Sequence, residues 1–237
     1  MKTLKKLILL LMVAVTSYGT VLAGNSDETQ NRHVEGFNAI KVSTGIDLYL
    51  TMGDAEAVKV VADDDIIDDL ITEVKNGTLH IYMKRNNWFN WGSGNKTKKA
   101  YVTVKELEEL RASSGSDVKS QNMLKGEKLE VSCSSGSDVE LEVFYKNISV
   151  DTSSGSDSKL RGKVKTLRVD ASSGSDIKAA DLEAVICYAD ASSGSDITVN
   201  VSSEIYASAS SGSDINYYGK PEVRDINESS GGDVKQR

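Results

Sequence analysis

The chain has few of the side chains that most often carry catalysis or hold metal ions. Its 237 residues include only two histidines, His33 and His80, and neither stands at metal-ligand spacing from a Cys, Asp or Glu. No G-x-S-x-G or other nucleophile signature occurs. Cleavage of a polysaccharide would need two carboxylates, or a carboxylate with a base, in a non-repeating cleft. The sequence therefore predicts no catalytic residues and no cofactor, and a carbohydrate-active, pectin-lyase-like enzyme is the alternative.

Long apolar runs are scarce as well. The run Leu7–Val15 is too short to span a bilayer, follows Lys2, Lys5 and Lys6, and precedes the small-residue cleavage site Val21–Ala23. This pattern predicts a signal peptide over residues 1–23, a flexible mature N-terminus over 24–35, and export to the periplasm or the cell surface. No later run reaches membrane-spanning length, so no transmembrane segment is expected.

Basic residues are in deficit, with 28 Lys and Arg against 35 Asp and Glu and a net charge of −7. Loss of the three lysines in residues 1–23 would lower the net charge to −10, since −7 − 3 = −10. Binding of nucleic acid needs a basic stripe that neutralises phosphates. A nucleic-acid partner is therefore not expected.

The sequence is rich in one repeated motif. SSGSD begins at Ser113, Ser134, Ser153, Ser172, Ser192 and Ser210, and SSGGD begins at Ser229. Successive motif glycines (Gly115, Gly136, Gly155, Gly174, Gly194, Gly212 and Gly231) lie 18 to 21 residues apart. A fixed period of this size predicts a solenoid, in which each repeat buries its apolar face against its neighbours.

Apolar and small residues alternate with polar ones on both sides of each motif glycine. Positions −7, −5 and −3, such as Leu129, Val131 and Cys133, and position +3, with Ser158 as the exception, form one face. Period two predicts half-buried strands. Turn formers for a second bend in each coil stand at Gly126, Lys146–Asn147, Gly162, Ser202–Ser203 and Gly219. The sequence thus predicts an all-β fold, a parallel β-helix with coils of about 19 residues. An antiparallel meander is the alternative, but nothing in the sequence would cover its second face.

The turn residues have separate roles in this interpretation. Glycine admits a positive φ and leaves room for the next coil. If side chains alternate through the turn as they do along a strand, the serines at −1 and +1 point inward and the aspartate at +2 points outward. The −1 serines are then predicted to form an internal hydroxyl column (Ser114, Ser135, Ser154, Ser173, Ser193, Ser211 and Ser230). In the last copy Arg224 and Glu228 replace apolar residues, which predicts a polar C-terminal cap.

Only two cysteines occur, Cys133 and Cys187. Their motif glycines are three repeats apart, and coils that rise roughly 4.8 Å each would separate them by roughly 14 Å, beyond the reach of a disulfide. Both are therefore expected to be free, buried, small apolar residues.

The motif aspartates are expected to lie in one outward column. Like charges at this spacing repel, so either cations or neighbouring lysines must compensate. A weak cation ladder through Asp157, Asp176 and Asp196 is one hypothesis. Lys119, Lys159, Lys178 and Lys235, each two residues after a motif aspartate, favour the structural alternative.

Residues 36–105 contain no regular repeat but have β character, including a hairpin around Asn76–Gly77. One irregular segment, Arg85–Lys99, holds Trp88, Phe89 and Trp91 and four basic residues. Exposed aromatic side chains can stack on sugar rings or anchor a protein partner. These three residues are the predicted ligand contacts, unless they fold back to cover an end of the coil.

Residues 36–235 resemble a known family. The stretch from Phe37 to Asp54 with its Gly45-Ile46-Asp47, the strand from Val58, the segment Asn76–Ile81 and the serine-glycine-aspartate coils are similar to the family named "putative auto-transporter adhesin, head GIN domain". The resemblance implies a right-handed β-helix in a single domain over 36–237, with irregular coils over 36–105 and repeat coils over 106–237. It also implies a non-catalytic, adhesin-like protein whose partner is a glycan or a cell-surface protein. A purely structural envelope protein is the further alternative.

Overall fold

The computed structural model describes residues 26–84 and 96–237. Within them the chain forms 17 strands and one 3-10 helix, η1 (Ile67–Asp69). The strands are β1 (Asp27–Arg32), β2 (Ala39–Val42), β3 (Asp47–Met52), β4 (Ala57–Asp63), β5 (Leu70–Lys75), β6 (Thr78–Met83), β7 (Lys98–Val104), β8 (Glu109–Ser113), β9 (Asp117–Ser120), β10 (Leu124–Ser134), β11 (Asp138–Ser153), β12 (Asp157–Ser172), β13 (Asp176–Ala191), β14 (Asp196–Ala209), β15 (Asp214–Tyr218), β16 (Val223–Glu228) and β17 (Asp233–Gln236).

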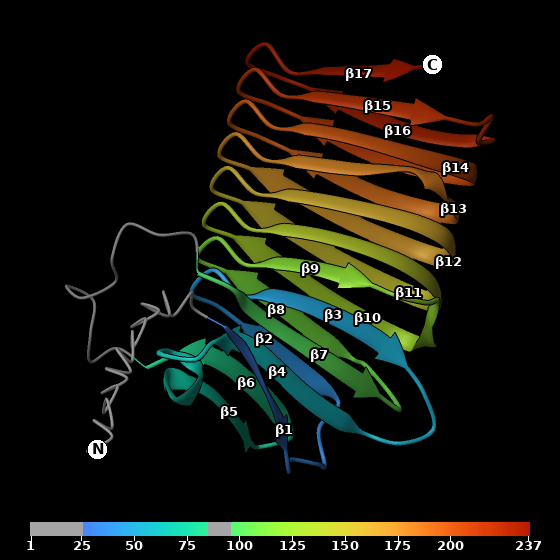
Figure 1. Ribbon diagram of the computed structural model, residues 1–237. Helices are drawn as coiled ribbons and strands as arrows, with labels where there is room; N and C mark the ends of the chain where they lie inside the picture. The colour runs from blue at the N-terminus through green and yellow to red at the C-terminus, as the bar shows by residue number, and fades with distance from the viewer. Residues whose placement is uncertain (1–25, 85–95) are drawn as a thin grey trace, which may run out of the picture.

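The strands wind into a β-solenoid of about seven turns, as the repeat period predicted. The strand that follows each serine-glycine turn pairs in parallel with the equivalent strand of the next coil, and so does the strand that precedes the turn. We call the first set the front sheet (β7, β3, β9, the N-terminal halves of β11–β14, β15 and β17). The second set is the return sheet (β6, β2, β8, most of β10, the C-terminal halves of β11–β14, and β16). In Figure 1 the front sheet runs left to right nearer the viewer while the coils climb toward the C-terminus, which makes the coil right-handed.

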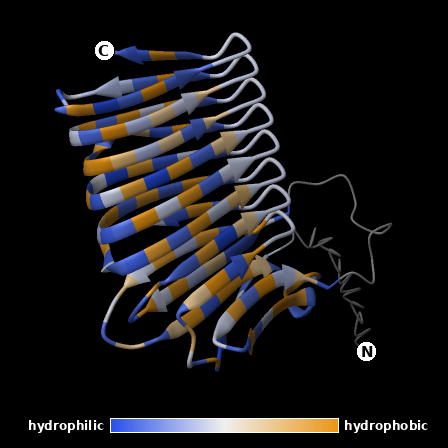
Figure 2. Ribbon diagram, turned by 180° about the vertical axis from the view of Figure 1, so that it is seen from behind, coloured by the Kyte–Doolittle hydropathy of each residue, from blue (hydrophilic) through white to orange (hydrophobic). Residues whose placement is uncertain are grey.

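The core lies between the two sheets and follows the predicted alternation. Along β11 the apolar side chains Val139, Leu141 and Val143 are each at most 2% exposed. Figure 2 shows the same alternation of hydrophobic and hydrophilic bands along successive coils. Burial of this continuous apolar stripe at roughly 25 cal/mol per Å² is the main force that stacks the coils.

The repeat begins earlier than the sequence predicted. Ser43–Asp47 form a turn of the same kind, with φ of +70° at Thr44 and +67° at Gly45. The N–H of Gly45 donates to the carbonyl of Ser114 at 3.0 Å, and the same bond to the next coil is made by Gly115, Gly136, Gly155, Gly174 and Gly194. The expectation of no regular repeat over 36–105 is therefore wrong for this turn, because Thr and Ile replace two serines of the motif.

The coils at the N-terminal end do not stack in chain order. β2 pairs in parallel with both β6 and β8, and β3 pairs in parallel with both β7 and β9. The coil that comes first in the chain thus lies between the second and the third.

Antiparallel strands close this end of the solenoid. β5 pairs with β6 in the hairpin predicted around Asn76–Gly77, and β4 pairs with β7 and β1. The expectation of a flexible segment over 24–35 is wrong for Asp27–Arg32. These residues form β1, since pairing with β4 satisfies backbone groups that β4 would otherwise expose.

The second bend lies close to the predicted residues. In β11 the two consecutive outward residues Lys146 and Asn147 interrupt the alternation, as predicted. In β12 the interruption falls at Lys165–Thr166. Gly162, predicted to make that bend, instead lies where a Cβ would stand 2.1 Å from the carbonyl oxygen of Val143 in the neighbouring coil. It is required for close approach of the two backbones.

The prediction for the serines is half wrong. The −1 serines are exposed and have φ between +49° and +60°, whereas the +1 serines Ser116, Ser137, Ser156, Ser175, Ser195 and Ser213 are fully buried. Two successive residues in the left-handed region reverse the chain, so the strand parity does not continue through the turn. The internal hydroxyl column is therefore built by the +1 serines, and the N–H of Ser137, for example, donates to Ser156 Oγ at 3.1 Å.

The C-terminal coil has the predicted polar end. Every residue of β16 is exposed, including Arg224 and Glu228 at core-facing positions. Glu228 Oε1 accepts a hydrogen bond from the N–H of Val234 at 2.7 Å, and Arg224 Nη1 donates to Gln236 Oε1 at 3.4 Å.

Candidate ligand-binding site

The outward face of the front sheet carries two parallel columns of functional side chains beside the turns. The residue two after each turn glycine is an aspartate, which gives the aspartate column (Asp47, Asp117, Asp138, Asp157, Asp176, Asp196, Asp214 and Asp233). The residue four after each glycine gives a second column that begins with Tyr49, Lys119, Glu140, Lys159 and Lys178. The alternation of the strand places both columns on the same face.

A hollow of about 390 Å³ opens on this face at the N-terminal end of the columns. Its polar lining is formed by carboxylates, lysines and one tyrosine (Asp47, Tyr49, Asp117, Lys119, Asp138, Glu140, Asp157, Lys159 and Lys178). Five carboxylates face three lysines, so the hollow is acidic overall but offers both hydrogen-bond acceptors and donors. We call it the front hollow.

Tyr49 forms the aromatic part of the front hollow and is held by a stack. Its ring lies 5.0 Å from the ring of Tyr101, with an interplanar angle of 17°. Lys59 Nζ lies 4.5 Å from the centre of the Tyr101 ring. Because Tyr101 covers one face of Tyr49 and Lys59 covers the far face of Tyr101, the ring of Tyr49 is fixed in orientation at the edge of the hollow.

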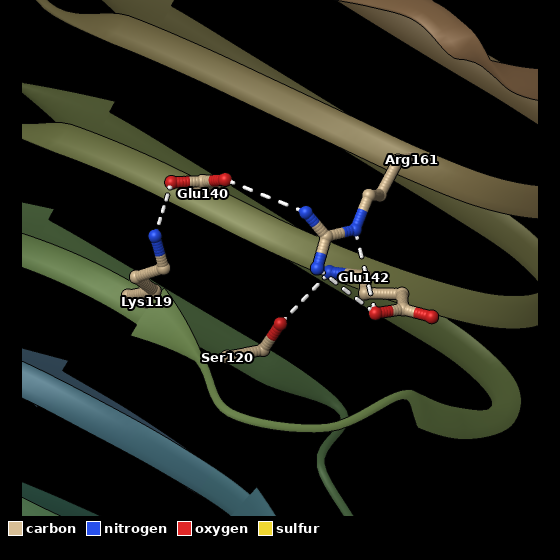
Figure 3. Close-up of polar contacts among 5 residues, drawn as sticks. All are labelled: Lys119, Ser120, Glu140, Glu142 and Arg161. Carbon is tan, nitrogen blue, oxygen red and sulfur yellow. Dashed lines mark hydrogen bonds and ion pairs between the residues drawn. The ribbon is translucent and has the colours of Figure 1, made fainter.

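Glu140 lines the front hollow and belongs to a network of ion pairs with residues of the neighbouring coils (Figure 3). Glu140 Oε2 lies 2.9 Å from Lys119 Nζ, and Glu140 Oε1 lies 3.6 Å from Arg161 Nη1. Arg161 Nη2 also pairs with Glu142 at 3.0 Å. The hydrogen bond from Lys119 is the main cause that lowers the pKa of Glu140. These pairs hold the long side chains of three adjacent coils in a fixed array.

Asp117 is a carboxylate of the hollow whose pKa is raised. Burial raises its pKa, and the neighbouring carboxylates of Asp138 and Asp47 raise it further. A bound group that donates hydrogen bonds or carries positive charge would relieve this cost. Asp117 is thus a candidate contact for such a group.

The cation ladder considered from the sequence, through Asp157, Asp176 and Asp196, stays a prediction. In residues 26–84 and 96–237, no three His, Cys, Asp or Glu side chains gather in a way that could hold a metal ion. Lys178 Nζ instead lies between Asp157, at 3.0 Å, and Asp176, at 3.2 Å. Lys235 pairs with Asp233. Burial is the main cause that raises the pKa of Asp196, and the neighbouring carboxylates of Asp176 and Asp214 raise it further.

A second tyrosine stack lies on the return sheet. The rings of Tyr188 and Tyr206 are 4.9 Å apart at 10°, and Arg168 lies 4.7 Å from the centre of the Tyr188 ring. Sequence reasoning missed both stacks. Arg168, Tyr188 and Tyr206 all stand six residues before a motif glycine, and Tyr49 stands four after Gly45, so alignment of the repeats by position would have found them.

The predicted aromatic contacts Trp88, Phe89 and Trp91 lie outside the described residues. Of the histidines, His80 lies on β6 opposite Glu73 and Lys41, and His33 is exposed after β1.

A family model described as "putative auto-transporter adhesin, head GIN domain" matches residues 36–221. The chain belongs to this family. The name-giving Gly-Ile-Asn is Gly45-Ile46-Asp47 here, in the turn between β2 and β3, and its Asp47 lines the front hollow. No curated relative of the chain was found.

Solved structures share the head GIN fold. A "putative adhesin" from Bacteroides fragilis aligns with a TM-score of 0.83 at 21% identity, over 90% of this chain and 98% of its own. A "putative lipid binding protein" from Parabacteroides distasonis aligns with a TM-score of 0.67 at 24% identity, over 90% and 98%. A "putative adhesin" from Parabacteroides merdae aligns at 0.69 and 14% identity, over 89% and 96%. At these identities the likeness establishes the fold. In the part of the chain that the structure describes, no helix has the length and apolar character needed to cross a membrane.

Proposed function

We propose that this head GIN protein is an exported, non-catalytic adhesin that binds a surface glycan in the front hollow. The observation that carries the proposal is the arrangement around Tyr49. A fixed aromatic ring lies beside carboxylates that accept hydrogen bonds and lysines that donate them, in a hollow of about 390 Å³. Sugars present hydroxyl groups to such acceptors and donors and pack their C–H faces on aromatic rings.

The geometry of the solenoid supports a polymeric ligand. Equivalent side chains recur at every coil, roughly 4.8 Å apart, so a chain of sugars lying along the columns would meet a related set of groups at each coil. Among the residues of the front hollow that stand four after a turn glycine, Tyr49 is the one with an aromatic ring. An aromatic contact is thus offered at the N-terminal end of the columns. Binding is therefore expected to be anchored at Tyr49 and Asp117.

Export rests on the sequence of residues 1–23, which precede the described part of the chain. Two observations support the proposal that the protein is not an enzyme: its family is described as adhesins, and its carboxylates repeat regularly from coil to coil. An acid and a base need environments that separate their pKa values, whereas the column presents the same residue in the same turn at each coil.

A glycan array and pull-downs on bacterial and host polysaccharides test the proposal. We expect binding by the wild-type protein, at least tenfold weaker binding by Asp117→Asn, and unchanged binding by Asp214→Asn, which stands in the same column away from the hollow. Analysis of the bound polysaccharide for cleavage products separates this function from the enzyme, and we expect none. Binding to no glycan, or equal binding by both variants, would leave a protein partner or a structural role as the better account.

A further inference from the structure

The C-terminal end of the solenoid leaves two strand edges open. Among residues 26–84 and 96–237, β16 pairs only with β14, and β17 pairs only with β15. Large apolar side chains are exposed there, with Val223 at 44%, Ile226 at 36% and Tyr218 at 43%. Open edges with exposed apolar residues are templates for pairing with another chain.

The backbone polarity of both edges is known from their inner bonds. The N–H groups of Asp233 and Arg237 donate to β15 residues or the turn before them, so those of Val234 and Gln236 point to the open side. The N–H of Ser229 donates to Ala209, so alternation directs the N–H groups of Ile226 and Glu228 to the open side of β16. Ile226 and Val234 can thus each exchange two hydrogen bonds with an antiparallel partner strand.

The charges on the two edges are self-complementary about these residues. If β16 pairs antiparallel with a second β16 centred on Ile226, Arg224 lies opposite Glu228 and Asp225 lies opposite Asn227. If β17 pairs with a second β17 centred on Val234, Asp233 lies opposite Lys235. Centring β16 on Asp225, or β17 on Lys235, would instead place like charges opposite each other, which is unfavourable.

The two centres belong to the same coil and lie across the core from each other. Ile226 stands five residues before Gly231 and Val234 stands three after it. In the equivalent coil at Gly155, Thr152 at −3 touches Ser158 at +3, with 2.8 Å between the hydroxyl oxygens. In the coil at Gly136, Cys133 at −3 also lies 2.9 Å from the carbonyl oxygen of Ser137 at +1. Position −3 thus lies opposite about +2 and position −5 opposite about +4, so the centres differ by about one residue, roughly 3.3 Å, along the strands. One two-fold axis, slightly tilted, serves both pairs of strands.

We propose that two copies of this chain dock end to end through β16 and β17, in a two-fold arrangement centred on Ile226 and Val234. The same polar residues that close the end of one chain then form the contacts between two. Glu228 leaves the N–H of Val234 and pairs with Arg224 of the other copy, and the exposed Ile226 side chains become buried. The interface is small, so association is weak and depends on concentration.

Sedimentation of the purified exported chain over a concentration series tests the proposal by exchange of charges. Arg224→Glu and Glu228→Arg each place like charges opposite in a self-pair, and we expect each to weaken self-association roughly tenfold. An equimolar mixture of the two variants is expected to associate at least as well as the wild type. In the mixed pair, both negative residues of one chain face both positive residues of the other. A change within one chain cannot produce this recovery.

A single mass for the wild type at all concentrations would overturn the proposal, and so would a mixture that associates no better than its components. If either charge variant fails to fold, Ile226→Cys replaces it. This cysteine faces its own copy, so copper-catalysed air oxidation should link two chains, whereas Val223→Cys, which is more exposed but off the axis, should not. Equal linking of both, or linking of neither, would contradict the arrangement.

Discussion

Ser195 Oγ donates a hydrogen bond of 2.8 Å to the carbonyl oxygen of Ala171, one coil away. Ser195 Oγ also accepts a hydrogen bond from the N–H of Ser192 at 3.1 Å. The hydroxyl is fully buried and reinforces a backbone pair, since the N–H of Ser192 also donates to the carbonyl of Ala171 at 3.0 Å.

Ser195→Ala therefore removes two buried hydrogen bonds, while the N–H of Ser192 keeps its bond to the carbonyl of Ala171. We expect the free energy of unfolding, measured by urea denaturation, to fall by about 1–2 kcal/mol. Ser193→Ala, in the same turn but exposed, is the matched control and should change it by less than about 0.5 kcal/mol. A larger effect at Ser193 would place the inner column at the −1 serines after all.

Two glycines of the coil should respond differently to alanine. Gly136 has φ of +68° and open space around its Cα, so Gly136→Ala should cost about 1–2 kcal/mol from backbone strain alone. Gly162→Ala would place a Cβ 2.1 Å from the Val143 oxygen and should cost more than about 3 kcal/mol or prevent folding. Thermal unfolding of both variants checks the order, and equal costs would contradict the close approach of the two coils.

Asp117 should make stability depend on pH. Its pKa is raised by burial, so its ionised form disfavours the folded state above that pKa and the cost disappears as the pH falls through it. Asp117→Asn is expected to raise the melting temperature by roughly 1–2 °C at pH 7, since the group is partly exposed and screened. At pH 3 the difference should vanish. A constant difference between pH 3 and pH 7 would assign the effect to packing.

Both cysteines should be unreactive in the folded protein. Cys133 and Cys187 are free and at most 1% exposed. Burial raises the pKa of Cys133 to about 11 and that of Cys187 to about 12, so little thiolate forms at pH 8. Ellman's reagent should find no thiol in the native protein and two after denaturation. Rapid labelling of one thiol without denaturant would show that a coil opens locally.

The sequence predicted the coil because its period and its alternation agree. Positions −7, −5 and −3 are buried as expected, and the turn glycines have the positive φ that only glycine adopts freely. The serine column was assigned to the wrong serine because strand parity was carried through Ser135 and Gly136, where two left-handed residues reverse the chain. The backbone conformation of the turn, and not the alternation of the strand, determines which serine points inward.

The candidate site was less accessible from sequence. Tyr49 and Lys119 occupy the same position relative to their turn glycines, so recognition of Ser43–Asp47 as a copy of the motif would have placed them side by side. Tyr101 could not have been placed in this way, because β7 follows no motif turn and its register depends on stacking beneath β3. The predicted contacts Trp88, Phe89 and Trp91 remain a prediction.

The most direct measurement of the central claim compares glycan binding by Tyr49→Ala with binding by Tyr188→Ala. Each variant removes one ring of a tyrosine stack next to a cation, at a similar expected cost in stability of about 1 kcal/mol, but only Tyr49 lines the front hollow. We predict that Tyr49→Ala weakens binding at least tenfold and that Tyr188→Ala leaves it unchanged. Equal affinities for the two variants, both folded, would contradict a binding site on the front sheet.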